Sequence, residues 1–566
     1  MDKIWQLVKP VPVLAEKLSQ SLSVSLIIAQ VLLNRGVKTL PEAEVFLKPT
    51  LKNLRNPFEI PNIVKAAERV LLAKEKGEKV LIYGDYDVDG VTGTTILVQT
   101  LRHLGIEVAY YIPDRYGEGY SLSIEAVKKI ADSGVKLIVT VDCGIASVKE
   151  VDEANRLGLE VVVTDHHNIP QQLPNAYALV NPKLIPNEQP SKYLSGSGVA
   201  FKFAWALLKV AKLKDVEFLT SLLDLAALGT FSDVVPLNEE NRVIAVGGLK
   251  LINERKRLGI KALAEASSLK DQITENQIYF GLAPRINAAG RIEHASKSVE
   301  LFLSEDADEV QALAAELNKI NTRRQGIGKD IREEVFERLK DQPAGAKVVV
   351  LEGEGWHPGV IGIVASRVVD QLGCPAVLIG INDGVGRGSA RSIGGVNIYA
   401  LLDSCRDLFL DFGGHEGAAG FEVAVDKIPE LKKRLQEKAA ELISDEDLKA
   451  RLLIDAELEA KVITMSLAKE LSVLGPYGEG NRVPIFVTKG MKIESMRAVG
   501  ADGRHLKAKF AKEGNSFDSI GFGLGEKAAE LNYNNMYDIA YRLETNLWNG
   551  FESVQLSLVD IKEANK

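Results

Sequence analysis

The spacing of hydrophobic and polar positions changes along the chain. Between residues 79 and 164 it is typical of a parallel α/β sheet. Residues 1 to about 75 are predicted to be mainly helical. Short apolar runs then alternate with amphipathic helical stretches; the runs cover 79–84, 107–112, 136–141 and 160–164, and the stretches cover 94–104, 123–132 and 147–157. Short buried strands separated by helices form a parallel sheet with right-handed crossovers.

The central part of the chain predicts two further structural regions. Helical patterns dominate from about 196 to 270, and 306–340 has the pattern of a long, charged helix that could connect domains. An α/β pattern returns at 347–445. Within it, the expected strands cover 347–351 and 376–379, and the expected glycine-rich turns cover 384–388 and 413–420.

The C-terminal part predicts a small β-barrel. Short strand-like runs such as 485–488 and 519–523 are broken by turn residues. Residues 481–512 contain eight Lys or Arg against two acids. Interspersed aromatic residues are Phe486, Phe510, Phe517, Phe522, Trp548 and Phe551. A basic barrel with exposed rings is suited to single-stranded nucleic acid, although for any one ring a place in the barrel core is the plainer interpretation.

Composition narrows the class of protein. At 566 residues the chain is too long for one core, and 46% hydrophobic with 26% charged residues is ordinary for a globular protein. No apolar run approaches the ~18 residues that span a bilayer, and the first ten residues lack the features of a signal peptide. Three widely spaced cysteines argue against disulfides and suit a reducing cytoplasm. The net charge of −8 places any nucleic-acid site in a local basic patch.

Acidic and histidine residues cluster where the predicted strands of the parallel sheet end. The members are Asp85, Asp87 and Asp89 after the first strand, Asp142 after the strand at 136–141, and Asp165, His166 and His167 after the strand at 160–164. A fourth cluster contains Asp233 and follows an apolar helical stretch. In such sheets, ligands bind beyond the carboxyl ends of the strands. The clusters therefore predict a metal centre that handles phosphate.

The donor types favour a particular kind of metal. Carboxylates with one imidazole suit Mn²⁺ or Mg²⁺ better than Zn²⁺, which favours cysteine or more histidine. Two such ions about 3.5–4 Å apart can activate water and stabilise the leaving oxygen in phosphodiester hydrolysis. For any single aspartate a helix cap or turn is the plainer interpretation, and Asp89-Gly90 fits the cap of the helix expected at 94–104. Four clusters in succession favour the metal centre.

Several motifs resemble a known family. Asp165-His166-His167, with Gly-Asp-Tyr-Asp-Val-Asp-Gly at 84–90 upstream, resembles the DHH phosphoesterase superfamily. Three more motifs resemble the bacterial single-strand-specific exonucleases of that superfamily: Ala-Pro-Arg-Ile-Asn-Ala-Ala-Gly-Arg at 283–291, Gly-Gly-His-Glu-Gly-Ala-Ala-Gly at 413–420 and Gly-Pro-Tyr-Gly-Glu-Gly-Asn at 475–481. The resemblance extends over nearly the whole chain in the right order, with least support in the first 50 residues.

The resemblance implies an architecture and an activity. The expected parts are an N-terminal helical segment at 1–75, a parallel-sheet DHH catalytic domain at 76–300, a connecting helix at 301–342, a DHHA1-type substrate-binding α/β domain at 343–450, and an OB-fold barrel at 451–566. The implied activity is 5′-to-3′ degradation of single-stranded DNA to 5′-mononucleotides in recombination and repair, with up to two Mn²⁺ or Mg²⁺ ions.

The resemblance also implies roles for individual residues. The implied metal ligands are Asp85, Asp87, Asp89, Asp142, His166 and Asp233. Asp142 would bridge the two ions, His167 would face the scissile phosphate or support the ligands, and Asp165 would orient its neighbours. Other branches of the superfamily have a histidine four residues before the position of Asp87. Here Tyr83 takes that place and Asp85 stands nearby, so one metal site is expected to be weaker.

The substrate-binding residues expected from the resemblance are Arg285, Asn287, Arg291, Ser389, Arg391, Gly414 and His415, and the basic excess of the C-terminal barrel adds Arg504 and Lys507. Ser389 and Arg391 resemble a 5′-phosphate-binding pair, and arginine suits phosphate because its planar fork binds two oxygens. The glycines at 413–420 could bring backbone N–H groups to a phosphate, or form only a tight packing turn. Charge reversal at Arg504 and Lys507 is expected to weaken DNA binding and spare cleavage.

The sequence also leads to expectations about binding partners and to two alternative functions. The resemblance implies single-stranded DNA as substrate, with single-strand-binding protein and a RecQ-type helicase as further partners, no membrane association, and a cytoplasmic monomer. One alternative is a phosphodiesterase for very short oligonucleotides or cyclic dinucleotides, which the basic barrel and chain length disfavour. Another is a binding or scaffold protein with an inactive site, which the clustered acids disfavour.

Overall fold

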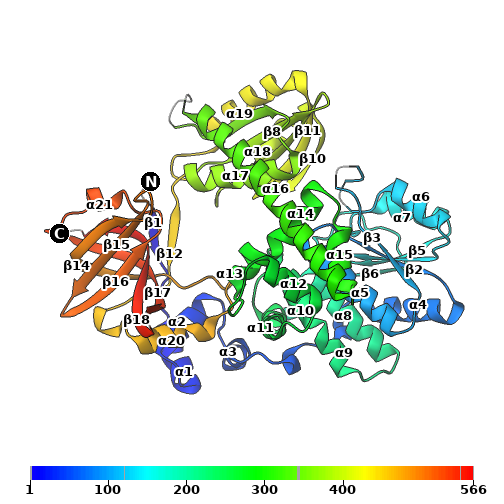
Figure 1. Ribbon diagram of the computed structural model, residues 1–566, viewed down its shortest axis with the longest axis horizontal. Helices are drawn as coiled ribbons and strands as arrows, with labels where there is room; N and C mark the ends of the chain where they lie inside the picture. The colour runs from blue at the N-terminus through cyan, green and yellow to red at the C-terminus, as the bar shows by residue number, and fades with distance from the viewer. Residues whose placement is uncertain (1–2, 116, 120, 341–344, 549, 565–566) are drawn as a thin grey trace. The chain divides into compact units, whose positions relative to one another are not determined.

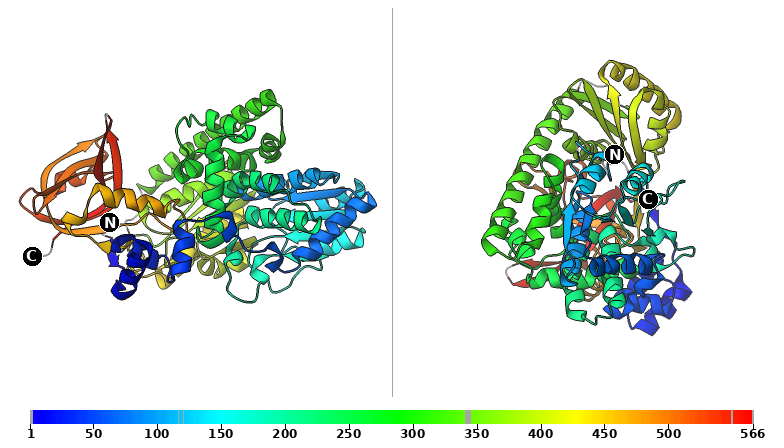
Figure 2. Two further views of the ribbon diagram at one scale, coloured as in Figure 1. Left: turned by 90° about the horizontal axis from the view of Figure 1, so that it is seen from below. Right: turned by 90° about the vertical axis from the view of Figure 1, so that its right-hand side faces the viewer.

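The computed structural model describes residues 3–115, 117–119, 121–340, 345–548 and 550–564 (Figures 1 and 2). The contacts divide the chain into two compact units. Unit 1 consists of the N-terminal residues up to Trp5, Arg291–Glu293 and Glu316–Leu452; unit 2 consists of Gln6–Gly290, His294–Ala315 and Leu453–Lys566. Among the described residues, no helix combines the length and the apolar character needed to cross a membrane.

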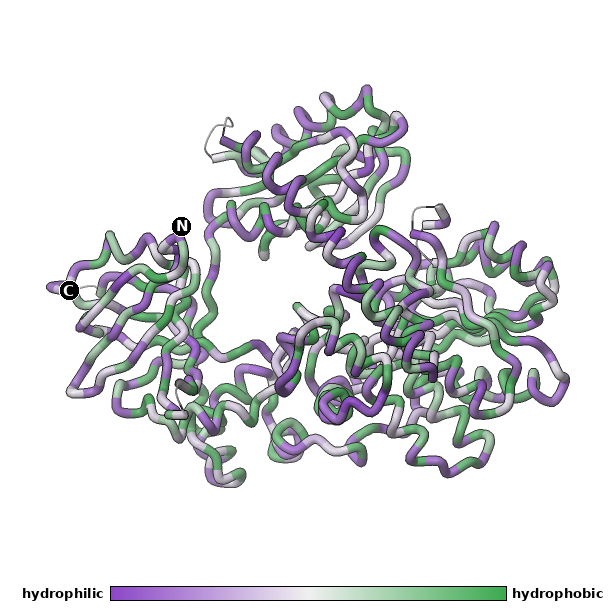
Figure 3. The backbone as a smooth tube through the Cα atoms, in the orientation of Figure 1, coloured by the Kyte–Doolittle hydropathy of each residue, from purple (hydrophilic) through white to green (hydrophobic). Residues whose placement is uncertain are grey.

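A five-stranded parallel sheet forms the centre of unit 2, as the alternating pattern predicts. Its strands are β2 (Val80–Gly84), β3 (Val108–Tyr111), β4 (Leu137–Val141), β5 (Glu160–Thr164) and β6 (Ala178–Val180), in the order β3-β2-β4-β5-β6. Figure 3 shows hydrophobic positions concentrated in these strands. The three residues of β6 are too few for a recognisable pattern, and this strand was not predicted.

Helices cover both faces of this sheet. One face packs against α6 (Ile124–Asp132) and α7 (Val148–Arg156), and the other packs against α4 (Ile63–Lys76), α5 (Val88–His103) and α8 (Gly196–Val210). Helix α5 begins six residues before the predicted start at 94. Its first two turns contain glycine and threonine, which have low helix propensity, but they are buried and Asp87 caps them by accepting from the N–H of Gly90 at 3.0 Å.

A helical region follows the sheet, as predicted. Its main helices are α9 (Val216–Ser221), α10 (Leu223–Ser232), α11 (Glu239–Glu254), α12 (Leu258–Ala266), α14 (Ala283–Ile292) and α15 (Ser296–Leu303). Helix α10 packs against α5, α8 and α11. The predicted long helix is α16 (Ala307–Leu339), with 33 residues. Its first nine residues belong to unit 2 and the rest to unit 1.

Unit 1 is a three-layer α/β structure. Its strands are β7 (Val349–Glu354), β8 (Ala376–Asn382), β9 (Val385–Arg391), β10 (Phe409–His415) and β11 (Ala418–Ala424), in the order β10-β11-β9-β8-β7. Helix α17 (Pro358–Leu372) packs with α16 on one face, and α18 (Ile398–Asp403) and α19 (Ile428–Leu442) pack on the other. Only β7 and β8 are parallel.

The predicted glycine-rich turns of unit 1 are wrong in extent. Only residues 383–384 and 416–417 form turns, and the other glycines lie in the paired strands β9, β10 and β11. These glycines permit close packing, since a Cβ on Gly388 would lie 2.0 Å from the ring of Phe421. At Gly388 and Gly414, close contact with neighbouring strands, and not turn geometry, accounts for the glycine.

The C-terminal barrel of unit 2 is closed by five strands. They are β14 (Phe486–Val499), β15 (His505–Lys512), β16 (Asn515–Gly521), β17 (Met536–Trp548) and β18 (Phe551–Glu563), in the order β14-β15-β16-β18-β17, and β17 pairs back onto β14. The predicted small barrel is confirmed. The runs expected at 485–488 and 519–523 are parts of longer strands.

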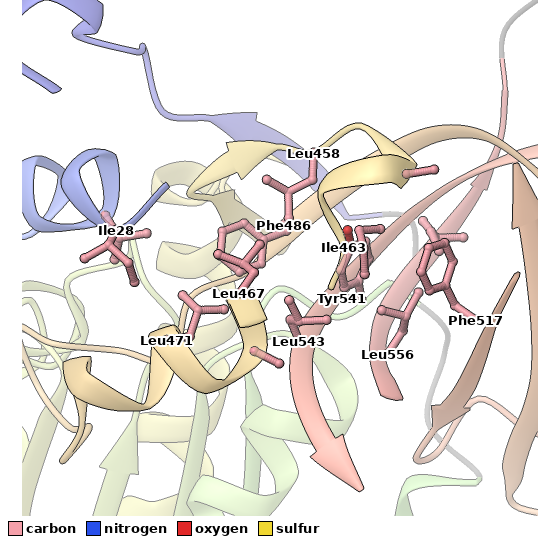
Figure 4. Close-up of a cluster of buried hydrophobic side chains, with 14 of the residues drawn as sticks. Ile28, Leu458, Ile463, Leu467, Leu471, Phe486, Phe517, Tyr541, Leu543 and Leu556 are labelled. Carbon is pink, nitrogen blue, oxygen red and sulfur yellow. The ribbon is translucent and has the colours of Figure 1, made fainter. Parts of the chain in front are cut away.

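The N-terminal helices share a hydrophobic core with the barrel. Helices α1 (Pro12–Leu22), α2 (Leu26–Asn34) and α3 (Leu40–Leu47) contribute to one cluster with the barrel strands and α20 (Met465–Leu471). Figure 4 shows Ile28 in this cluster with Leu471, Phe486 and Tyr541. An unpredicted strand, β1 (Ile4–Leu7), precedes these helices and pairs with β12 (Arg451–Ile454).

Candidate metal centre

The carboxyl edge of the parallel sheet brings the predicted acids and histidines together. Their ligand atoms form three overlapping groups, each with all atoms within 4.8 Å of one another. The groups are Asp85, Asp87 and Asp142; Asp89, His166 and Asp233; and Asp142, His166 and His167. Because Asp142 belongs to two groups, its carboxylate is placed to be shared between two neighbouring ions.

Asp89 is held by the first turn of α8. Its Oδ2 accepts from the N–H of Gly196 at 2.5 Å and its Oδ1 from the N–H of Ser197 at 2.9 Å. The end of α10 also comes close, since a Cβ on Gly229 would lie 2.5 Å from Oδ1 of Asp89. A helix N-terminus favours negative charge, so α8 both orients and stabilises this carboxylate.

Asp142 has an uncommon backbone conformation. Its φ is +62°, in the left-handed region, and its N–H donates to the carbonyl of Thr164 at 3.1 Å. A Cβ on Gly196 would lie 2.5 Å from its Oδ1, so only glycine fits there. Non-glycine residues in this region cost energy and persist where the surrounding structure enforces them, often at functional sites.

The two histidines point into the same group of carboxylates. His166 Nε2 lies 3.0 Å from Asp142 Oδ1 and 3.5 Å from Asp233 Oδ2. His167 Nδ1 lies 2.8 Å from Asp165 Oδ1. Asp165 also accepts from the backbone N–H groups of both histidines and of Ile145, so its carboxylate orients the whole turn.

Burial and mutual repulsion raise the pKa of most of these acids. Burial followed by the charges of neighbouring aspartates raises the pKa of Asp85, Asp87, Asp89 and Asp142. Asp165 differs: burial opposes ionisation, but its hydrogen bond with His167 and the charges of both histidines lower its pKa. Burial lowers the pKa of His167, but the same hydrogen bond together with the charges of Asp165, Asp233 and Asp85 outweighs burial and raises the pKa of that imidazole to about 9.

The donor set fits a divalent cation. Oδ1 of Asp85 and Oδ2 of Asp233 are buried and accept no hydrogen bond from the described residues. Buried carboxylate oxygens without donors are costly unless a cation is bound. Oxygen donors with one or two imidazoles suit Mn²⁺ or Mg²⁺. Tyr83 supplies no ligand because its hydroxyl donates to the carbonyl of Ser121 at 3.0 Å, on the α6–α7 face of the sheet.

The motif at 283–291 lies partly against residues 86–88, in the segment that carries Asp87 and Asp89. Asn287 Oδ1 accepts from the N–H of Val88 at 3.2 Å, and a Cβ on Gly290 would lie 2.6 Å from the carbonyl oxygen of Tyr86. Arg285 donates to the carbonyl of Gly281 at 2.6 Å. Asn287, predicted to bind substrate, is therefore placed to hold α14 against the start of α5.

The predicted phosphate-binding residues of unit 1 gather near α17. Arg391 donates to Oγ of Ser389 at 3.1 Å, and a Cβ on Gly362 would lie 2.8 Å from both side chains. Arg291 donates to the carbonyl of Gly359 at 3.2 Å. Gly414 and His415 are exposed on β10, at the edge of the sheet.

The barrel residues have mixed surroundings. Lys507 is exposed on β15 and lies opposite Arg497 of β14, whereas Arg504 is ion-paired with Asp502 at 2.5 Å. Among the aromatic residues, Phe486, Phe510 and Phe517 are in the core, and Phe522 and Phe551 are 67% and 80% exposed. The side chain of Trp548 lies outside the described residues.

Two sets of residues that support this centre were not predicted from the sequence. The Ser-Gly-Ser-Gly run at 195–198 precedes a long apolar stretch, which is the signal of a helix N-terminus. The end of β6 supplies Asn181, which donates to the carbonyl of His167 at 3.0 Å, and Lys183, which donates to Asn168 at 3.0 Å. No sequence signal identifies these two, because β6 itself is too short to recognise.

Family models and relatives agree with this architecture. The DHH family, N-terminal domain, matches residues 79–230, the DHHA1 domain matches 345–441, and the RecJ OB domain matches 454–560. The single-stranded-DNA-specific exonuclease RecJ of Bacillus subtilis is 38% identical over 98% of this chain and 70% of its own length. The Haemophilus influenzae protein of the same name is 35% identical over 91% of this chain and 93% of its own length. The chain belongs to the RecJ family.

Solved RecJ structures have the same fold. RecJ from Thermus thermophilus in complex with Mn²⁺ aligns with a TM-score of 0.86 and 33% identity, over all of this chain and 80% of that one. The same protein in complex with Mg²⁺ aligns with a TM-score of 0.81 and 31% identity, over all of this chain and 79% of that one. The predicted fold class, with its DHH, DHHA1-type and OB parts, is confirmed.

Proposed function

We propose that this member of the RecJ family is a metal-dependent exonuclease that hydrolyses single-stranded DNA in the 5′-to-3′ direction and releases 5′-mononucleotides, in DNA recombination and repair. The observation that carries the proposal is the set of three ligand groups at the carboxyl edge of the parallel sheet, joined through Asp142 and His166. Cations bound by these groups would supply the chemistry of phosphodiester hydrolysis. The names of the relatives support single-stranded DNA as the substrate.

Each residue of the centre has a proposed part in the reaction. Asp85 and Asp87 with Asp142 would hold one cation, and Asp89, His166 and Asp233 with Asp142 would hold the other. The bound cations would activate a water and stabilise charge on the phosphate. His167, kept protonated by Asp165, would donate a hydrogen bond to an oxygen of the scissile phosphate.

Residues outside the centre would bind the strand. Arg391 and Ser389, with Arg291, would bind the 5′-phosphate, and this would restrict cleavage to a strand end. Arg285, Gly414 and His415 would bind further along the strand, as would Lys507 and Arg504 of the barrel. Asn287 would act indirectly, through the loop that carries Asp87 and Asp89.

The test uses single-stranded DNA labelled at either end, with Mg²⁺ or Mn²⁺, and an Asp142→Ala control. We expect stepwise release of mononucleotides from the 5′ end by the wild-type protein and none by the variant. Turnover of dinucleotides without cleavage of long strands would instead indicate a phosphodiesterase for short substrates. DNA binding without turnover would indicate a scaffold.

The family resemblance extends the proposal to the setting of the enzyme. It supports a cytoplasmic monomer that works with single-strand-binding protein and a RecQ-type helicase. Light scattering of the chain alone, and then with each partner, tests the monomer and both associations.

A further inference from the structure

The Gly-Pro-Tyr-Gly-Glu-Gly-Asn motif has no part in the proposed reaction, although it lies against the segment that follows a metal ligand. We call residues 475–481 the motif loop and residues 233–238 the Asp233 loop; both belong to unit 2. The N–H of Leu237 donates to the carbonyl of Glu479 at 2.8 Å. The motif loop precedes β14, and so joins the barrel to the catalytic part of the unit.

The two loops fit closely because the motif has glycines where they meet. A Cβ on Gly478 would lie 2.5 Å from Oη of Tyr279 and 2.6 Å from Cδ1 of Leu237. A Cβ on Gly480 would lie 3.1 Å from Cβ of Pro236. Any side chain at Gly478 must therefore displace Tyr279 or Leu237, and Leu237 is four residues from Asp233.

Helix α11 holds both loops from within. Arg242 is buried and donates to the carbonyl of Gly475 at 2.7 Å and to the carbonyl of Phe46 at 2.6 Å. Asn241 donates to the carbonyl of Pro236 at 3.0 Å. Within the motif loop, Asn481 donates to the carbonyls of Leu474 and Pro476 at 2.8 and 2.9 Å. These bonds make the motif loop a rigid support.

Asp233 needs such a support more than the other proposed ligands do. Asp85, Asp142 and His166 directly follow strands of the sheet, and Asp87 and Asp89 lie at the start of α5, whereas Asp233 ends helix α10 and begins a loop. Its side chain is 26% exposed, and Val234 beside it is 81% exposed. Oδ1 of Asp233 accepts from the N–H of Val234 at 2.8 Å, so the position of this carboxylate depends on the backbone of the Asp233 loop and on what fixes it.

We propose that the motif loop is a positioning element for Asp233. Its contacts with Pro236 and Leu237 hold the Asp233 carboxylate where a cation binds. Metal affinity in the DHH part therefore depends on the segment that carries the barrel. Gly478 and Arg242 are the positioning residues. The inference rests on the proposed function only in assigning Asp233 as a ligand. Residues that support a metal ligand from behind typically change metal affinity by roughly 10- to 100-fold when altered.

The experiment compares Gly478→Ala with Glu479→Ala in the full-length protein. Gly478→Ala introduces the clash with Tyr279 and Leu237. Glu479→Ala is the matched control, because its exposed side chain is lost while the carbonyl that holds Leu237 is kept. Mn²⁺ affinity is measured by isothermal titration calorimetry, and cleavage of single-stranded DNA is measured over a series of Mn²⁺ concentrations.

We expect Gly478→Ala to bind one Mn²⁺ roughly 10- to 100-fold more weakly, and its cleavage rate to recover at high Mn²⁺. Glu479→Ala should match the wild type in both measurements. Circular dichroism and thermal unfolding without metal separate positioning from loss of folding, because Mn²⁺ that binds the native state would also restore a chain that is only destabilised. If Gly478→Ala does not fold, Gly480→Ala perturbs the same loop through its contact with Pro236 and through the strain of an alanine at φ +70°, and its Mn²⁺ affinity decides in the same way.

Wild-type Mn²⁺ affinity in the variant would overturn the proposal, whatever its activity. A rate that excess Mn²⁺ does not restore would also overturn it and would indicate that the motif loop acts on the DNA. Failure of the proposed function is distinguishable, because then the wild-type protein itself would not cleave DNA, whereas the metal affinities of the variants could still be compared.

Discussion

At the scale of single residues, neighbours determine what an aspartate does. Asp165 receives hydrogen bonds from three residues, and His167 lowers its pKa. Asp85 is equally buried, but it faces Asp87 and has an oxygen without a donor, so its pKa is raised. The first is the environment of an orienting carboxylate, and the second is an environment that suits a carboxylate binding a cation.

A third aspartate, Asp455, shows how such an environment affects stability. Its side chain is fully buried and accepts hydrogen bonds from Arg35 at 2.7 Å and Asn34 at 3.1 Å. Burial opposes its ionisation, but Arg35 and Asn34 outweigh burial and lower its pKa. A carboxyl whose pKa is lowered by folding stabilises the native state above its unfolded value of about 3.9, and that stability is lost as the pH falls through the folded value.

We expect Asp455→Ala to lower the free energy of unfolding by about 3–5 kcal/mol at pH 7, because Arg35 is left buried without its partner. The difference from the wild type should shrink as the pH falls below about 4. Urea unfolding across this range measures both effects. Asp271→Ala, at an exposed aspartate, is the control; a difference between Asp455→Ala and wild type that is independent of pH would contradict the argument.

At the scale of elements, alternation along the barrel strands separates core from surface. Phe510 points into the barrel, while Lys507 points outward opposite Arg497. Lys509, on the same strand, lies 3.9 Å from Glu494. The basic residues of 481–512 are thus not equivalent: Arg504 and Lys509 have acidic neighbours, and Arg497 with Lys507 forms the clearest excess of positive charge.

We expect the double change Arg497→Glu and Lys507→Glu to raise the Kd for single-stranded DNA by at least about tenfold, because charge-assisted hydrogen bonds to phosphate are removed. This corresponds to a loss of about 1.4 kcal/mol of binding free energy. The dependence of Kd on salt should also weaken, by about one unit of slope for each phosphate that is no longer neutralised. Fluorescence anisotropy at several salt concentrations measures both, and Lys433→Glu on α19 is the control. Cleavage of short oligonucleotides should be unchanged, and an unchanged Kd would contradict the assignment.

At the scale of the whole molecule, the first helices and the last domain form one folding unit. Ile28 and Leu32 of α2 are fully buried in the same core as Phe486 and Tyr541. Arg35 and Asp455 join the same parts. The N-terminal segment therefore forms part of the core of the barrel, although the two are more than 400 residues apart in sequence.

We expect Leu32→Ala to cost about 2–5 kcal/mol, the usual range for truncating a buried leucine. Hydrogen exchange should accelerate in β14 and β17 and stay unchanged in β7 and β8, which belong to unit 1. Val13→Ala is the control, because Val13 is in the same segment but 81% exposed. Faster exchange confined to α1–α3 would contradict a shared folding unit.

Local patterns predicted the elements whose side chains repeat with a clear period. The strands at 80–84, 137–141 and 160–164 and helix α16 are examples, because burial on both faces of a strand, or on one stripe of a helix, leaves a regular trace in the sequence. The placing of Asp87, Asp142 and His166 at one edge followed from the rule that parallel strands share a carboxyl end.

The errors occurred where a local pattern depends on a distant partner. The glycines of β9–β11 indicated turns, but they lie in paired strands, where Phe421 packs against Gly388 and the backbone of Ala418 packs against Gly414. The threonines and glycines at the start of α5 disfavour a helix, but Asp87 and the surrounding core stabilise one. In each case tertiary contact outweighed a local propensity of about 1 kcal/mol per residue.

The sequence by itself determined the class of fold, the order of the domains and the chemistry of the ligand set, because each depends on residue type and spacing along the chain. Only the tertiary structure decided which contacts place each proposed ligand: the N–H groups of α8 for Asp89, the carbonyl of Thr164 and the space left by Gly196 for Asp142, and the motif loop for the segment after Asp233. It also decided that the N-terminal helices belong to the barrel. These contacts join residues that are tens to hundreds of positions apart, and their free energy arises only when the folded chain brings both sides together.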